Sequence, residues 1–116
     1  MLNLDLTSTK IYLRPGYTDG RKQINGLAAL VRDQFLANPL DGSLYLFFGL
    51  GGRRLKILYW DRNGFCLWMK RLEEDRFPWP KSPQEVQHIQ RWQLELLLQG
   101  IDFRKAHPVR NYQYAG

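Results

Sequence analysis

Apolar residues recur at helical spacing in the segment that follows Tyr17. Five of them fall at steps of i, i+3, i+4, i+7 and i+11, on one face of a helix: Ile24, Leu27, Ala28, Val31 and Phe35. Thr18 or Asp19 is the expected N-cap, and the turn-rich residues 38–42 are expected to end the helix. The pattern therefore predicts an amphipathic helix between two strands.

Strand patterns surround this helix. Residues 10–14 alternate and end at Pro15-Gly16, a turn pair. Residues 43–49 are apolar on both alternations, which predicts a central strand covered on both faces. Residues 85–89 alternate again and predict an edge strand, after the proline-rich residues 76–83, which are expected to be extended or irregular.

Residues 54–72 predict a hairpin around Asn63-Gly64. A three-residue loop, with Gly64 in the left-handed position, is favoured over a two-residue turn because it leaves one face entirely apolar. The other face then carries two tryptophans flanked by two lysines: Lys56, Trp60, Trp68 and Lys70. Either this face stacks bases and holds phosphates, or a helix covers the tryptophans while the lysine stems extend outward.

The last predicted element is a helix over residues 91–100, with Gly100 as its stop. Its apolar side consists of Leu94, Leu97, Leu98 and Ile101. The order β-α-β-β-β-(β)-α predicts an α+β fold, a small antiparallel sheet of four to five strands with two helices. We expect a single domain over residues 1–104 and a flexible tail over 105–116.

The charge balance narrows the classes of partner. Among 116 residues, 17 Lys and Arg against 11 Asp and Glu give a net charge of +6 and favour nucleic acid. A single cysteine, Cys66, excludes an internal disulfide and suits a reducing cytosol. No apolar run reaches the roughly 18 residues of a membrane helix, and the start of the chain lacks a secretory pattern, so we expect no membrane association.

Two basic clusters are candidates for phosphate contact. Arg21 and Lys22 lie in the first turn of the predicted helix, where free amides and the helix dipole attract anions, and Arg14 lies on the preceding strand. The alternative is that Asp19 caps the helix while both side chains are solvated. The second cluster lies along the two strands of the predicted hairpin and consists of Arg53, Arg54, Lys56, Lys70 and Arg71.

Signatures of catalysis are scarce. Two histidines and one cysteine form no zinc pattern, and the glycine-rich "GLGGRRLK" lacks the Gly-Lys-Ser/Thr ending of a phosphate loop. Asp61 suits a turn, and Glu73 stands in an acidic run. We therefore expect no enzyme activity, no cofactor and no metal.

Three segments in order carry a family resemblance: "YTDGRKQINGLAALV" at 17–31, "RRLKILYWDRNGFCLWMKRLEEDRFPWP" at 53–80 and "QLELLLQGIDF" at 93–103. Together they resemble the TnpB-type accessory protein of a large group of bacterial insertion sequences, which is unrelated to the RNA-guided nucleases of the same name. Gly20 departs from the pattern, where a larger apolar residue is expected. The resemblance implies a role in transposition beside a separate transposase and other proteins encoded by the same element.

Two hypotheses follow for function. The first is a non-catalytic accessory factor that contacts element-end DNA together with the transposase, in the bacterial cytoplasm and associated with the nucleoid when DNA is bound. The second is a protein-interaction module that docks the transposase without touching DNA. Its candidate docking residues are the apolar side chains around the proline-rich segment and the second helix: Phe77, Trp79, Trp92 and Leu96.

Overall fold

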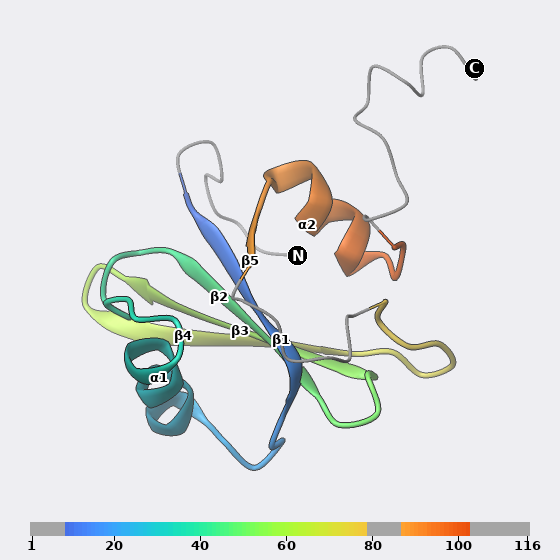
Figure 1. The fold of residues 1–116 in the computed structure, drawn as a ribbon, viewed down its shortest axis with the longest axis horizontal. Helices are drawn as coiled ribbons and strands as arrows, with labels where there is room; N and C mark the ends of the chain where they lie inside the picture. The colour runs from blue at the N-terminus through green and yellow to red at the C-terminus, as the bar shows by residue number, and fades with distance from the viewer. Residues whose placement is uncertain (1–8, 79–86, 103–116) are drawn as a thin grey trace.

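A five-stranded sheet with one helix on each face forms the protein (Figure 1). The computed structural model describes residues 9–78 and 87–102. Along the chain its elements are β1 (Ile11–Thr18), α1 (Ile24–Asp33), β2 (Leu44–Gly49), β3 (Arg54–Asp61), β4 (Gly64–Arg71), β5 (Gln87–Ile89) and α2 (Arg91–Leu98). This confirms the predicted order and the α+β class with two helices.

The sheet is mixed. Its strand order is β4-β3-β2-β1-β5, and only β1 and β2 run parallel among the paired strands. Helix α1 connects these two strands, as a parallel pair requires a crossover. The antiparallel meander β2-β3-β4 is confirmed, and β5 is the expected edge strand over residues 87–89. Residues 85–86 of that prediction lie outside the described part of the chain.

Each face of the sheet has its own core. On the α1 face, α1 packs its buried residues against side chains of β2 and β3: Leu27, Ala28, Val31, Tyr45, Phe47 and Leu58. On the α2 face, Leu94, Leu97 and Leu98 of α2 pack against the buried strand side chains that point to that face. Strand β2 is buried from Leu44 to Phe48, as the two-sided apolar pattern predicted, because both helices cover it.

Strand β1 continues beyond the predicted turn. Pro15 and Gly16 lie inside a strand that ends at Thr18, and the register with β2 shifts between Leu13 and Tyr17. Gly16 has a φ of +80°, so the pair produces an irregularity within the strand instead of a chain reversal.

Helix α1 begins later than predicted. Its N-cap is Gln23, without a side-chain capping bond, so the expected cap at Thr18 or Asp19 is wrong. Asp19 instead accepts a hydrogen bond from the Arg21 backbone amide at 2.9 Å and closes a turn before the helix. The helix ends at Asp33, ahead of residues 38–42. Arg21 and Lys22 therefore precede the helix, and the expected anion site on its first turn is not formed by them.

The hairpin adopts the two-residue loop. Asp61 pairs with Gly64 and Lys56 pairs with Met69, so the favoured three-residue register is wrong. The left-handed position belongs to Arg62, with a φ of 56°, and not to Gly64. Opposite residues of an antiparallel pair share a face, so the lysines and tryptophans separate. Lys56 and Trp60 lie on the α1 face, whereas Trp68 and Lys70 lie on the α2 face.

Helix α2 ends at Leu98, and the expected stop at Gly100 follows its C-cap with a φ of +81°. The Gly100 amide donates to the Leu97 carbonyl at 2.9 Å and the Ile101 amide to the Leu96 carbonyl at 3.0 Å, the two bonds of a Schellman motif. Ile101 itself is 44% exposed and lies outside the core. Within residues 9–78 and 87–102, no helix is long and apolar enough to span a membrane. The predicted tail at 105–116 is not among the described residues.

Candidate nucleic-acid interface

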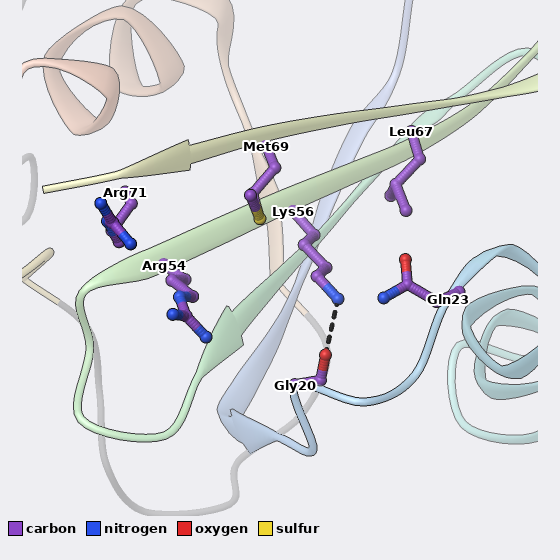
Figure 2. A pocket seen from close by; sticks show the side chains of 7 residues that line it. All are labelled: Gly20, Gln23, Arg54, Lys56, Leu67, Met69 and Arg71. Carbon is purple, nitrogen blue, oxygen red and sulfur yellow. Dashed lines mark hydrogen bonds between the residues drawn. The ribbon is translucent and has the colours of Figure 1, made fainter.

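A basic hollow opens on the α1 face at one end of the sheet (Figure 2). It lies where β3 begins, β4 ends and the loop after β1 approaches, and its volume is about 640 Å³. Its lining contains three cations and no carboxylate: Gly20, Gln23, Arg54, Lys56, Leu67, Met69 and Arg71. Figure 2 shows the two arginines at one end, Gln23 and Leu67 at the other, and Lys56 and Met69 between them. We call this set the basic hollow.

Arg54 and Arg71 form the centre of its charge. They are direct cross-strand partners in the β3–β4 ladder, so their Cα atoms lie close together and their side chains leave the same face. Like charges directly opposite each other on neighbouring strands are unfavourable. An anion bound between the two guanidinium groups removes that repulsion, and Arg binds phosphate oxygens through its planar fork.

The charge of this pair is only partly offset. Arg71 forms an ion pair with Glu73 at 2.8 Å, but both side chains are mostly exposed, so the pair is weak and easily exchanged. The Arg54 side chain has no hydrogen bond or ion pair to any described residue. Arg53 donates to the Glu73 carbonyl at 3.0 Å and lines an adjoining hollow of about 370 Å³ with the same two arginines.

Lys56 supports the hollow from inside. Only 9% of its surface is exposed, and its Nζ donates to the carbonyls of Gly20 and Lys22, both at 2.9 Å. Burial lowers the pKa of Lys56, the charge of Arg54 lowers it further, and Asp19 opposes both effects. The ammonium group thus uses two of its three donors to hold the loop before α1, so Lys56 is less available for the predicted phosphate contact than the exposed Arg54 is.

The first predicted cluster does not come together as one site. Arg21 forms a bidentate pair with Asp19, whose hydrogen bonds hold the pKa of that carboxyl at about 2. Lys22 is half-buried, with its stem against Gly26. Arg14 donates hydrogen bonds to the Gln34 side chain, the Tyr17 backbone carbonyl and the Thr18 hydroxyl. Its guanidinium group is therefore anchored to neighbouring elements.

The predicted tryptophan and lysine face is absent because of the register. Lys70 donates to the Leu98 carbonyl at 2.8 Å, at the C-terminal end of α2. Trp68 packs against the core under α2 and lines a second hollow, of about 490 Å³, with Lys70, Glu95, Leu98 and Gln99. Trp60 makes an edge-to-face contact with Phe65 at 5.1 Å, on the other side of the sheet.

The predicted docking residues divide between core and surface. Phe77 is 4% exposed and packs edge-to-face on Phe48, so it belongs to the core. Leu96 is partly buried against the α2-side core, and Trp92 is half-buried on the same helix. Trp79 lies outside the described residues. In the described ranges, no three His, Cys, Asp or Glu side chains lie together as ligands for a metal ion.

Sequence reasoning missed four lining residues of the hollow, Gly20, Gln23, Leu67 and Met69. Leu67 and Met69 were assigned to an apolar core face, yet Met69 is 54% exposed. Alternation along β4 already places both on the face of Arg71. The two-residue turn would have placed Lys56 opposite Met69 and Arg54 opposite Arg71, so that register was the signal available. Gln23 became part of the site because α1 begins after it.

The fold and this hollow define a small α+β domain with a basic, carboxylate-free hollow on one face of its sheet. Comparison with known proteins then identifies its family. A family model described as IS66 Orf2 like protein matches residues 9–108. The uncharacterized protein y4hO of Sinorhizobium fredii (strain NBRC 101917 / NGR234) is 38% identical over 106 residues, which cover 91% of this chain and 90% of that protein.

A second protein of the same strain, the uncharacterized protein y4jC, is 35% identical over 94 residues, covering 79% of this chain and 80% of the relative. No solved structure matches the chain significantly. The chain belongs to the IS66 Orf2-like family, which confirms the resemblance found in the sequence. Membership supports an accessory role in transposition, in association with the machinery of an IS66-type element.

Proposed function

We propose that the protein is a non-catalytic accessory factor that contacts element-end DNA through the basic hollow, together with a separate transposase. Family membership supports the link to transposition. The net charge of +6 supports a polyanionic partner. On this proposal the protein acts in the bacterial cytoplasm, at the nucleoid when DNA is bound.

One observation carries the proposal. Arg54 and Arg71 stand opposite each other on neighbouring strands in a hollow whose lining has no carboxylate. Arg53 extends this positive surface into the adjoining hollow. A duplex presents regularly spaced phosphates to such a surface, and contacts to phosphate position a protein without requiring a particular sequence.

The test is the salt dependence of binding to a duplex of the element end, measured by fluorescence anisotropy. Each phosphate contact contributes about −0.9 to the slope of log K plotted against log salt. The double variant Arg54→Ala/Arg71→Ala should therefore have a slope flatter by about two units than the original chain. Between 50 and 200 mM salt this corresponds to a roughly tenfold smaller loss of affinity.

A matched control removes the same charge elsewhere. Arg32 is exposed at the end of α1 and has no side-chain partner among the described residues, whereas Arg91 forms an ion pair with Glu95 at 3.1 Å. Arg32→Ala/Arg91→Ala therefore also removes one arginine without such a partner and one paired arginine. This variant should keep the original slope within about half a unit. Equal effects of the two double variants would mean that only net charge matters. Absence of binding at 50 mM salt would reject direct DNA contact.

Docking to the transposase without DNA is the alternative. The hollow on the α2 face favours it, because the half-buried Trp68 offers apolar surface beside Lys70 and Glu95. Tryptophan is enriched at the energetic centres of protein interfaces. If DNA binding fails while the transposase co-purifies with the chain, and Trp68→Ala abolishes that co-purification, the docking function replaces the DNA function.

A further inference from the structure

Strand β4 is an unusually open edge of the sheet. It lies at one end of the strand order, and no described residue pairs with its outer side. It spans 8 residues, whereas β5 at the opposite edge spans 3. A long edge strand exposes a row of backbone donors and acceptors, which another strand can pair with.

The hydrogen-bond phase identifies which groups point outward. The Leu72 amide donates to the Arg53 carbonyl at 2.8 Å, so residues 53 and 72 are a hydrogen-bonded pair of the β3–β4 ladder. Such pairs alternate with non-bonded pairs along antiparallel strands. Every second residue of β4 therefore bonds to β3, and the remaining residues turn their amides and carbonyls away from it: Phe65, Leu67, Met69 and Arg71.

Most of the usual protections of an edge are missing from β4. It contains no proline, its pairing with β3 shows no bulge, and its first six residues are uncharged. Met69, in the middle of the outward set, is 54% exposed. Lys70 and Arg71, the two cations of the strand, stand together at its C-terminal end.

We propose that β4 pairs antiparallel with β4 of a second copy of this chain, around a twofold axis at Trp68. Outward residues must face outward residues, so Leu67 lies opposite Met69 of the second copy and Phe65 lies opposite Arg71 of the second copy. All four outward residues then form hydrogen-bonded pairs, two bonds each. Both cations face uncharged residues, because Lys70 meets Cys66 of the second copy, so this register avoids like charges directly opposite each other.

The pairing fixes the arrangement of the two copies. The outward residues lie on the α1 face, as their partners in β3 do, so both α1 helices lie on one side of a continuous ten-stranded sheet. Both basic hollows then open to that same side. The inference rests on the edge of β4 and its self-complementary sequence, and it stands whether or not the hollow binds DNA.

The test is the association state of the full chain without DNA, by sedimentation equilibrium over roughly 1–500 μM, since small interfaces dissociate in the micromolar range or above. A monomer–dimer equilibrium is expected. Met69→Pro removes one outward amide and leaves the bonds to β3, so it should weaken the dimer at least about tenfold. Met69→Ala removes the side chain but keeps the amide, and should change the dissociation constant by less than about threefold.

Amide hydrogen exchange of the unmodified chain gives an answer even if the proline variant does not fold. In a dimer, the outward amides of Leu67 and Met69 should be as protected as those of Trp68 and Lys70, which bond to β3. A monomer at every concentration, with fast exchange at Leu67 and Met69, would overturn the proposal. So would a dimer that tolerates Met69→Pro, or outward amides that become protected only when the transposase is added.

Discussion

Replacement of Lys56 by methionine tests how the loop before α1 is held. Lys56→Met keeps the length of the stem and removes the ammonium group that donates to the carbonyls of Gly20 and Lys22. Those carbonyls lie in the loop that forms one wall of the basic hollow, so the variant should loosen this wall as well as lower stability. Lys10→Met is the matched control, because the Lys10 side chain is exposed.

The expected magnitude is a difference between two larger effects. A hydrogen bond from a charged donor contributes about 1.5–3 kcal/mol, so two such bonds contribute roughly 3–6 kcal/mol. Removing the ammonium group also removes the cost of burying a charge, which offsets several kcal/mol of this loss. We expect a net loss of about 1–3 kcal/mol for Lys56→Met and less than about 0.5 kcal/mol for Lys10→Met.

Urea unfolding followed by far-UV circular dichroism measures both variants at pH 7. Because the pKa of Lys56 is lowered below 10.5, the folded state binds its proton less tightly than the unfolded state does. The group is charged in both states at pH 7, where the shift lowers stability in full. This unfavourable contribution declines as pH rises from the lowered pKa toward 10.5, because the unfolded state then binds more protons than the folded state. A Lys56→Met variant as stable as the original chain, or more stable, would refute the anchoring role.

Two further predictions concern the turn before α1 and the end of α2. The Asp19 carboxyl should titrate by NMR with a pKa of about 2, and this pKa should move back toward 3.8 in Arg21→Ala. Any stability from the pair is therefore present above pH 3.8 and declines as pH falls through 2. An unchanged pKa in Arg21→Ala would exclude Arg21 as the cause. Gly100→Ala should cost about 1 kcal/mol in urea unfolding, because its φ is +81°. Gly64→Ala, at a glycine with no positive φ and no atom within 4 Å of an added Cβ, should cost less than half as much, and equal losses would contradict this explanation.

Periodicity was sufficient for the elements and their order. The helical spacing from Ile24 to Val31 and the two-sided apolar run from Leu44 to Phe48 both report burial directly, and burial is what the sheet and its two helices impose. The start of α1 could not be predicted from periodicity. The side chain of Asp19 satisfies a turn with Arg21 instead of the helix, and the loop is held by Lys56, which lies far away in sequence.

The register of the hairpin was missed because lysine was expected to seek water. Lys56 and Lys70 instead donate to backbone carbonyls on opposite faces of the sheet, one in the loop before α1 and one at the end of α2. These tertiary partners favour the two-residue loop and separate Trp60 from Trp68. The same register brings Arg71 opposite Arg54, so the error hid the strongest basic feature of the protein.

The most direct measurement is an NMR titration of the isotope-labelled chain with a duplex of the element end, followed through arginine Nε–Hε and backbone amide signals. The side-chain signals of Arg54 and Arg71 and the amides of residues 20–23 should shift together, while those of Arg32 and Arg91 stay in place. Shifts confined to the α2 face around Trp68 and Leu98, or no shifts at 50 mM salt, would contradict DNA contact through the basic hollow.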